Sequence, residues 1–378
     1  MKKLFLLAFI SILALSLSSC SGKGCDLLIL NWGDYMSDDL IIQFEEENNC
    51  NVKLVTTDSN ESMYSKIINK GADYDLVVPS DYMIDQMYSE GLLNEIDFSK
   101  LENYSEDMFV PELKELMDSD DCKRYKDYYL PYFWGSLGIM YSTKKYPELE
   151  EIVYEYGWRV LFDKTILPKG TRVAMYASSR DALAAAELYL GYSLNTTDKK
   201  EIDDCMNLLR KTDFYQWGTD DLKIDLSTGR IDLALVYSGD FFDAYYADLE
   251  AEGEDVEESN VDTYSIYAPT YHNNVFFDGL VIPNTCTNSE LAHKFLDFML
   301  TFQAGYDNAD YVGYCPTVNE VYEDITNDYE GWGDILEIEA YNPTNILATE
   351  GSWAEVYKYL GAETYAYIEK KFTSVIFR

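Results

Sequence analysis

The sequence predicts an α/β protein with two lobes, each built on a mainly parallel β-sheet flanked by helices. Its 378 residues exceed what one hydrophobic core normally organises, which favours two domains. Strand and helix patterns alternate from residue 27 to residue 79, and a similar alternation begins again at residue 173. No low-complexity linker separates the two units, so we expect short strand-like crossings between the lobes.

The N-terminal unit has the order strand, helix, strand, helix, strand. Its first strand is an apolar run, typical of a sheet that is covered on both faces. Ser37 can cap the helix that follows, in which Leu40, Ile41 and Phe44 recur at helical spacing. This alternation predicts parallel strands, because each connection passes through a helix. The other predicted elements are strands at 27–30, 52–55 and 76–78 and a helix at 63–68.

The second unit continues the alternation toward the C-terminus. Thr287 and Glu290 have the spacing of a capping box at the start of a late helix. Near the end of the chain, Trp353, Val356 and Tyr357 fall on one helical face, which predicts a terminal helix. The predicted elements are strands at 173–176, 233–236, 264–267 and 279–282 and helices at 181–190, 290–302 and 353–371.

The chain carries 68 acidic and 29 basic side chains, a formal charge of −39. This balance argues against binding to nucleic acid, whose phosphates require clustered lysine and arginine. The negative electrostatic field attracts cationic partners. The alternative is that the acidic surface only keeps the protein soluble. With 15% aromatic residues and a mean hydropathy of −0.26, the composition excludes a multispanning membrane protein and a disordered acidic tail.

The N-terminus has the pattern of an export signal. Lys2 and Lys3 precede an apolar run at 4–17 that is short for a membrane span. The following Leu17-Ser18-Ser19-Cys20 resembles a bacterial lipobox, which predicts a signal peptide at 1–19 and lipidation of Cys20. The alternative is an ordinary secretory cleavage site. We therefore expect an extracytoplasmic protein anchored by lipid to the cell membrane, on its periplasmic side or outer face.

Export also permits disulfides. Cys25 and Cys50 each precede a predicted strand, and neighbouring parallel strands could bring them within bridging distance. None of the cysteines is spaced as CxxC, which disfavours a structural zinc site. The remaining thiols are expected to be free and buried: Cys122, Cys205, Cys286 and Cys315.

The signatures of most enzymes are missing from the chain. It contains no GxxxxGKS or GxxxxGKT loop, no GxGxxG after a strand, no HExxH and no GxSxG. Its two histidines, His272 and His293, are too few for a catalytic triad and a metal shell, and His293 is expected on a helix in a surface or packing role. The sequence therefore favours a binding protein without catalytic residues, cofactor or metal.

An aromatic residue beside a carboxylate recurs where predicted strands end or begin. Ligands of open α/β sheets bind outside the carboxyl ends of strands. Aromatic faces attract ammonium groups by about 0.5 to 2 kcal/mol, and carboxylates add charge-assisted hydrogen bonds. Each motif alone also fits a turn aromatic beside a solvated acid, but together they predict a box for an aliphatic amine. The motifs are Trp32-Gly33-Asp34-Tyr35, Pro79-Ser80-Asp81-Tyr82, Tyr237-Ser238-Gly239-Asp240 and Phe276-Phe277-Asp278.

At these residues the chain resembles the spermidine/putrescine-binding proteins of ABC-type polyamine importers. The resemblance extends over about residues 27 to 370, and several ordered blocks are more specific than any single motif. Besides the first of the loops above, the blocks are Ser59-Asn60-Glu61-Ser62-Met63-Tyr64, Tyr74-Asp75-Leu76-Val77-Val78-Pro79-Ser80, Pro131-Tyr132-Phe133-Trp134-Gly135, Leu190-Gly191-Tyr192-Ser193 with Asn195-Thr196-Thr197-Asp198, and Gly313-Tyr314 with Pro316-Thr317.

The resemblance implies a two-lobed periplasmic-binding fold that closes on its ligand about a hinge. It implies that the ligand lies between aromatic walls while acids hold its amino groups. The residues that match family positions for ligand contact are Trp32, Asp34, Tyr35, Ser80, Tyr82, Asp181, Tyr237, Asp240, Phe276, Asp278 and Tyr314.

Some positions depart from the family pattern. Tyr237 and Phe276 stand where the family usually has tryptophan, which keeps a π face but weakens its attraction for a cation. Ser178 occupies a position that is aspartate in spermidine-preferring members, and Ala354 falls where some members have a glutamine that contacts the ligand. The acids that match family positions, Asp34, Asp181, Asp240 and Asp278, are closer to the set that the resemblance implies for putrescine-binding members.

The lobe boundaries follow from three expected crossings, at 131–135, 273–277 and 318–325. One lobe then comprises residues 20–133 and 276–320, and the other comprises residues 134–275 and 321–378. We expect a monomer that captures putrescine and/or spermidine in the cleft between the lobes and delivers it to the membrane permease of an ABC importer. Two alternatives stay open: another small solute such as ferric iron, thiamine or another cation on the same fold, and a carboxylate-dependent extracellular hydrolase.

Overall fold

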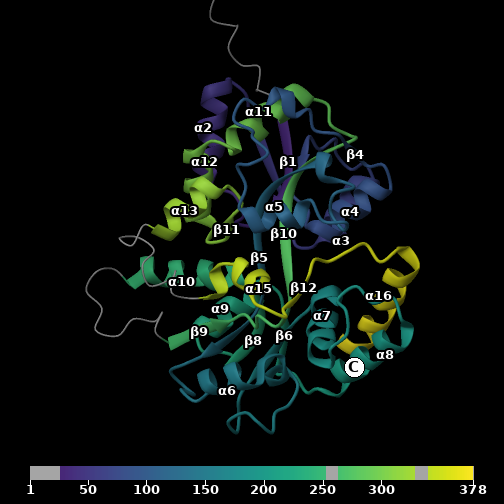
Figure 1. Ribbon diagram of the computed structural model, residues 1–378, viewed down its shortest axis with the longest axis vertical. Coiled ribbons are helices and arrows are strands. Elements are labelled where there is room, and N and C mark those ends of the chain that lie inside the picture. Colours follow the sequence, from purple (N-terminus) through teal and green to yellow (C-terminus); the bar gives the residue numbers. More distant parts are fainter. Residues whose placement is uncertain (1–25, 253–262, 328–338, 378) are drawn as a thin grey trace, which may run out of the picture.

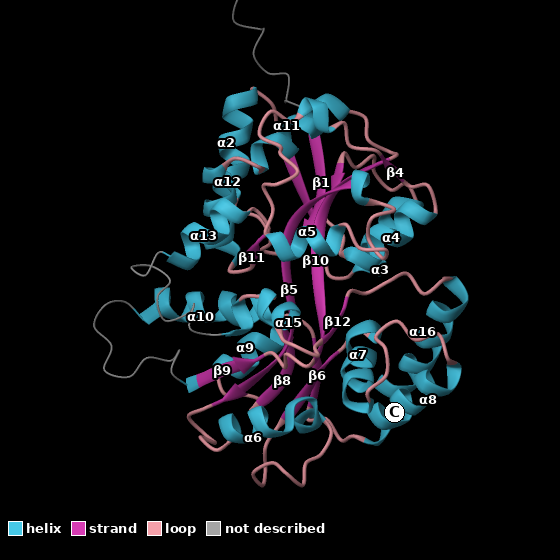
Figure 2. Ribbon diagram, viewed as in Figure 1, coloured by secondary structure: helices cyan, strands magenta, loops and turns pink. Residues whose placement is uncertain are grey.

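The computed structural model describes residues 26–252, 263–327 and 339–377, which form two lobes joined by long strands (Figure 1). Neighbouring strands follow the order β2-β1-β3-β10-β5-β8-β6-β7, so the strand pairing continues from one lobe into the other. Helices lie outside the strands in both lobes (Figure 2). The α/β class and the two-lobed arrangement predicted from the sequence are confirmed.

The lobe that contains the first strands has the predicted βαβαβ order. Strand β1 (Leu27–Trp32) lies between β2 (Val52–Thr57) and β3 (Leu76–Val77) and pairs with both in parallel. Helices α2 (Asp38–Asn48) and α3 (Asn60–Ile68) make the connections. The same lobe contains α4 (Asp81–Ser89), β4 (Leu93–Asn94), α5 (Pro111–Met117), α11 (Ser289–Met299), α12 (Phe302–Val312), β11 (Cys315–Pro316) and α13 (Asn319–Asn327).

Two long antiparallel strands run through both lobes, β5 (Tyr129–Ser142) and β10 (His272–Pro283). Every residue of both strands is buried. The crossings expected at 131–135 and 273–277 lie inside these strands, and the predicted strand at 279–282 is only the last part of β10. The apolar pattern stops at Asn273 and Asn274, yet both are buried because their side-chain amides donate to the carbonyls of Leu137 and Glu355.

The second lobe is built on a mixed sheet rather than the mainly parallel one expected, because some of its strands pair with β5 in the antiparallel direction. Strand β6 (Val173–Tyr176) pairs in parallel with β7 (Gln216–Gly218) and β8 (Leu233–Tyr237), as predicted for β6 and β8. Strand β9 (Tyr264–Tyr267) pairs with β5 in the antiparallel direction. The helices of this lobe are α6 (Leu149–Tyr156), α7 (Ser179–Leu190), α8 (Lys199–Lys211), α9 (Asp221–Ser227), α10 (Ser238–Glu252), α15 (Thr344–Ala348) and α16 (Ala362–Ile376), and short 3-10 turns lie at Gly157–Leu161 and Glu339–Tyr341.

Two of the predicted helix caps are wrong. Ser37 stands at the N-cap of α2, but its side chain makes no capping hydrogen bond, and its backbone N–H donates to Oδ1 of Asn308 over 3.1 Å. Thr287 and Glu290 form no capping box, because Asn288 caps α11 by accepting from the N–H of Leu291. The backbone N–H of Thr287 donates instead to Asp75.

The C-terminal segments also differ from the prediction. The helix expected at 290–302 ends at Met299, and α12 begins at Phe302. The terminal helix expected at 353–371 is wrong in its first half, because β12 (Trp353–Glu355) pairs in parallel with β10. The ring of Trp353 stacks on His272 with centroids 4.1 Å apart, and Gly361 holds a φ of 81° just before α16 begins. The stretch 318–325 lies mostly in α13, beside α12 (Figure 1).

The thiols predicted to be free are free: Cys122, Cys205 and Cys315 are buried and Cys286 is partly buried. His293 has a packing role, since it is buried and its Nε2 accepts from the N–H of Asp97. The signal peptide, Cys20 and Cys25 lie outside the described residues, so the lipid anchor and the Cys25–Cys50 pairing stay predictions. Within the described ranges, no helix is long and apolar enough to cross a membrane.

Candidate functional site

A cavity of about 450 Å³ lies between the two lobes. Its walls come from loops and helix starts that follow strands, together with the middle of β10. Trp32 ends β1 and Tyr35 follows it, Ser80 and Tyr82 stand at the start of α4, and Asp240 lies in the first turn of α10. The structure brings all of the ligand residues expected from the sequence to this one cavity: Trp32, Asp34, Tyr35, Ser80, Tyr82, Asp181, Tyr237, Asp240, Phe276, Asp278 and Tyr314.

Asp278 is a buried carboxylate on β10. One of its oxygens, Oδ2, accepts from the hydroxyl of Tyr35 over 2.5 Å. The other, Oδ1, is buried and makes no hydrogen bond with the described residues. Burial raises the pKa of Asp278 to about 6, although the hydroxyls of Ser80 and Tyr35 oppose the rise. Asp278 is therefore a buried acid with no cation beside it, and Asp81 of the same cavity also has a buried oxygen, Oδ2, that makes no hydrogen bond with the described residues.

Tyr35 is held firmly beside Asp278. Its backbone carbonyl accepts from the hydroxyl of Tyr132 over 2.7 Å, and the amide of Asn308 donates in turn to that hydroxyl over 2.7 Å. The ring of Tyr35 meets the ring of Tyr314 edge to face, with centroids 5.1 Å apart. Trp32 is fixed by its indole N–H, which donates to the carbonyl of Val78 over 2.8 Å.

A second buried acid, Asp181, stands in the first turn of α7. Its Oδ1 accepts from the hydroxyls of Tyr237 over 2.6 Å and Tyr357 over 3.4 Å. Burial raises the pKa of Asp181, since the opposing hydrogen bonds from Tyr237 and Ser178 do not outweigh it. Ser178 caps α7 by accepting from the N–H of Asp181 over 3.4 Å.

The third buried acid, Asp240, is enclosed by groups of the protein itself. Its Oδ2 accepts from the N–H of Tyr237 over 3.2 Å, and its Oδ1 accepts from the hydroxyl of Tyr314 over 3.0 Å. The ammonium of Lys223 lies 3.8 Å from Oδ1. Burial raises the pKa of Asp240, with Lys223 opposing and Asp220 adding to the rise.

Aromatic rings connect the three acids. Tyr237 meets Phe276 edge to face with centroids 4.9 Å apart, and Phe276 lies 6.4 Å from Tyr314. Tyr82 meets Tyr357 across the cavity at 6.0 Å. The ring of Tyr314 packs against the backbone of Gly239, where an added Cβ would lie 2.0 Å from the ring. This contact joins the two lobes at the cavity and requires glycine.

Several residues that line the cavity were not predicted from the sequence to bind a ligand. Glu61, which accepts from the hydroxyl of Tyr82 over 2.9 Å, follows β2 and could have been found by the strand-end rule. Tyr357 was assigned to a helix, and Lys223 follows β7, which is too short to be recognised. Ala354 lies in β12 and is not among the residues that line the cavity. The further lining residues without a predicted role include Asp81, Tyr176, Asp220 and Asp243.

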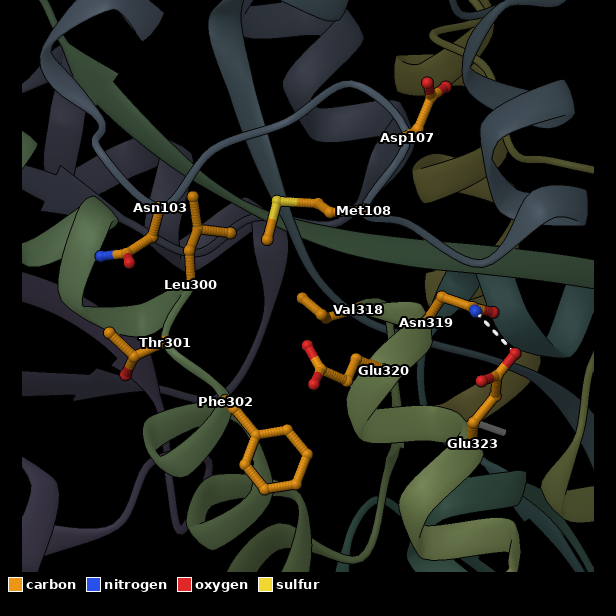
Figure 3. A pocket seen from close by; sticks show the side chains of 10 residues that line it. All are labelled: Asn103, Asp107, Met108, Leu300, Thr301, Phe302, Val318, Asn319, Glu320 and Glu323. Atoms are coloured by element: carbon orange, nitrogen blue, oxygen red, sulfur yellow. Dashed lines mark hydrogen bonds between the residues drawn. The ribbon is translucent and has the colours of Figure 1, made fainter.

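A second cavity, also of about 450 Å³, lies on the first lobe near the start of α13 (Figure 3). Its acidic side chains, Asp107, Glu320 and Glu323, are exposed, and Asn319 donates to Glu323 over 2.8 Å. Phe302 is its one aromatic lining residue among the described residues. It lacks the buried carboxylates and facing rings of the interlobe cavity, which is therefore the better candidate site.

The arrangement in the interlobe cavity suits a ligand with positive charge and apolar links. Buried carboxylates are costly unless a cation or hydrogen bonds compensate them. Aromatic faces attract ammonium groups and also pack against methylene groups. The described residues bring together no group of three or more histidine, cysteine, aspartate or glutamate side chains that could hold a metal ion.

The chain is similar to known bacterial proteins that bind small solutes. Residues 39–334 match the family described as "Bacterial extracellular solute-binding protein". The spermidine/putrescine-binding periplasmic protein of Salmonella typhimurium is 30% identical over 312 residues, 81% of this chain and 82% of that protein. The putrescine-binding periplasmic protein SpuD of Pseudomonas aeruginosa is 28% identical over 311 residues, 80% of this chain and 82% of that protein.

Solved structures resemble the fold over nearly the whole chain. A putative spermidine/putrescine ABC transporter protein from Listeria monocytogenes has a TM-score of 0.72 and 30% identity, covering 93% of this chain and 98% of that one. The substrate-binding protein PotD of a spermidine/putrescine ABC transporter from Streptococcus pneumoniae has a TM-score of 0.67 and 27% identity, covering 93% and 99%.

The raised pKa of Asp278 predicts a pH-dependent cost in stability. Because the folded-state pKa of about 6 exceeds the ordinary 3.8, ionisation destabilises the fold as the pH rises from about 4 to 6. In the ligand-free protein, Asp278→Asn should raise the free energy of unfolding at pH 7 by about 2 to 3 kcal/mol, and the gain should vanish near pH 4. Urea unfolding at both pH values measures the difference.

The matched control for this measurement is Asp34→Asn, because Asp34 lines the same cavity but is exposed. Its backbone has a φ of 49°, which asparagine also tolerates. Stability should change little in this variant at either pH. A loss of stability in Asp278→Asn at pH 7 would contradict the assignment of Asp278 as an uncompensated buried acid.

Proposed function

The chain belongs to the bacterial extracellular solute-binding proteins, which are not enzymes, and from this premise we propose that it captures a polyamine, putrescine and/or spermidine, for an ABC-type importer. The observation that carries the proposal is Asp278, a carboxylate buried among aromatic rings with one oxygen left without a partner in the described residues. A primary ammonium offers charge and three hydrogen-bond donors to such a group.

The rest of the cavity supports a ligand that carries a second cation at a distance from the first. Asp181, on the other lobe, accepts from the hydroxyls of Tyr237 and Tyr357. The rings of Tyr35, Tyr314, Phe276 and Tyr237 line the space around these acids and suit an aliphatic chain. An aliphatic diamine provides both charges and the apolar link.

The alternatives have weaker support in the same cavity. Ferric iron requires clustered oxygen ligands, whereas the tyrosine hydroxyls of Tyr35, Tyr237 and Tyr314 donate to carboxylates rather than converging on a shared point. A hydrolase is not favoured, because the family that the chain matches is one of solute-binding proteins. Polyamine capture is therefore the function that the geometry supports best.

The proposed mechanism is closure of two lobes around the ligand. We assign residues 26–133 and 276–327 to one lobe and the remaining described residues to the other, with β5 and β10 as the connecting strands; the boundary expected at 320 moves to 327 because the whole of α13 lies in the first lobe. Tyr314 from the first lobe donates to Asp240 of the second, a contact that forms only when the lobes meet. A ligand that neutralises the acids favours this closed form through its greater affinity for it.

The proposal places the protein outside the cytoplasm, tethered by a lipid on Cys20 after removal of residues 1–19. A tethered monomer stays near the permease to which it delivers its ligand. The mass of the mature chain isolated from membranes of its own host tests this part: a diacylated N-terminal Cys20 is expected, and an unmodified N-terminus would contradict the anchor.

The direct test of the function is calorimetry with putrescine and spermidine, alongside native mass spectrometry to identify any co-purified ligand. At least one of the two amines should bind, and butylamine, which has a single ammonium, should bind far more weakly. Asp278→Asn should cost about 2 to 5 kcal/mol of binding free energy, the range for truncating a buried charge pair. Failure of both polyamines to bind, or unchanged affinity in Asp278→Asn, would refute the proposal.

A second prediction concerns the contact between the lobes. In Gly239→Ala the added Cβ would lie 2.0 Å from the ring of Tyr314, so the ring must move and its hydrogen bond to Asp240 is lost. Polyamine affinity should fall by about tenfold or more, the equivalent of roughly 1.4 kcal/mol. Gly33→Ala is the matched control, since Gly33 lines the same cavity and has open space around its Cα. Equal affinities of the two variants would argue against this closure contact.

A further inference from the structure

Lys223 is the one basic residue among the described side chains that line the interlobe cavity. It comes from α9, and only 17% of its side chain is exposed. Its Nζ lies 2.6 Å from Oδ2 of Asp243 and 3.8 Å from Oδ1 of Asp240. The protein therefore holds a cation of its own inside a cavity that is otherwise acidic.

The surroundings of Lys223 keep it charged. Burial opposes the charged form, but the carboxylates of Asp240, Asp243 and Asp220 outweigh burial and raise its pKa. Because both oxygens of Asp240 also accept hydrogen bonds from Tyr237 and Tyr314, this carboxylate has its charge and its hydrogen bonds supplied by the protein. Lys223 thus offsets part of the negative charge at the Asp240 end of the cavity, where a ligand ammonium would meet a positive charge already in place.

The other two acids differ from Asp240 in this respect. Asp278 accepts from a tyrosine hydroxyl, and its Oδ1 has no partner among the described residues. Asp181 accepts from two tyrosine hydroxyls. The nearest guanidinium, that of Arg180, hydrogen-bonds to Asn195 and stacks 4.4 Å from the ring centre of Tyr357. Both acids thus lack an ammonium, whereas Asp240 already has one.

We propose that Lys223 acts as a built-in ammonium beside Asp240 that competes with a ligand amino group at this end of the cavity, and so makes the protein prefer the diamine putrescine over the triamine spermidine. A third ligand ammonium near Asp240 would lie close to the ammonium of Lys223, and like charges in a desolvated site repel strongly. The inference rests on the proposed polyamine function and adds the residue that sets its specificity.

The test is the ratio of spermidine to putrescine dissociation constants, measured by calorimetry in wild type and in Lys223→Met. Methionine keeps an unbranched side chain of similar length without the charge. In wild type the ratio should exceed one. In Lys223→Met it should fall by about tenfold or more, which corresponds to about 1.4 kcal/mol. The charge-retaining Lys223→Arg should keep a ratio near that of wild type.

A double variant separates charge from packing. In Lys223→Met/Asp240→Asn the carboxylate that would receive the third ammonium is gone, so the gain for spermidine should disappear. If Lys223→Met does not fold, as judged by its thermal unfolding, Lys223→Gln takes its place because an amide can still donate to Asp243.

These measurements separate a failure of the role proposed for Lys223 from a failure of the proposed polyamine binding. An unchanged ratio in a folded, uncharged variant, or equal weakening of both amines, would overturn the role of Lys223 while leaving polyamine binding intact. Failure of wild type to bind either amine would instead refute the proposed function itself.

Discussion

The structure of the site depends on one constraint: carboxylates are buried between two lobes without enough positive charge to match them. Asp278 lies on a fully buried strand and has an oxygen without a partner among the described residues. A carboxylate in such a place is costly unless a cation joins it. This cost is what a cationic ligand relieves, and it links the stability of the protein to its binding function. Aromatic rings surround the acids and exclude water, which strengthens the attraction for an ammonium group.

The fold places these groups by means of two long strands. Strand β10 runs through both lobes and carries Phe276 and Asp278 at the cavity, so the strand that joins the lobes also supplies the ligand's counter-charge. Two further acids come from helix starts after strands of the second lobe, where Asp181 and Asp240 stand in the first turns of α7 and α10. Tyr314, from the first lobe, reaches Asp240 and couples the position of the lobes to the acids. A change in charge at the cavity therefore acts on the same contacts that hold the lobes together.

Much of this could be predicted from the sequence, because strand ends in an α/β sheet meet at one edge. The loops after β1 and β8 were found by their aromatic and acidic residues, and the βαβαβ order followed from alternating patterns. The length of β10 could not be predicted, since Asn273 and Asn274 break its apolar run, and their side-chain amides donate to carbonyls that are distant in the sequence. The tail was misassigned because Trp353 and Tyr357 happen to recur at helical spacing, while pairing with β10 and the backbone of Gly361 decide the outcome. Lys223 follows a three-residue strand, and only the folded chain brings it to Asp240.

The most direct test is to measure how many protons the protein releases when putrescine binds beside Asp278. Free Asp278 has a pKa of about 6, so at pH 6 about half of the molecules carry its proton, and a ligand ammonium should lower that pKa and expel the proton. Calorimetric titration of putrescine at pH 6, in buffers with different ionisation enthalpies, measures this release. Release of up to about half a proton from Asp278 is expected at pH 6, falling toward zero at pH 8, where Asp278 is already ionised. Tight binding with no proton release at pH 6 would contradict this expectation.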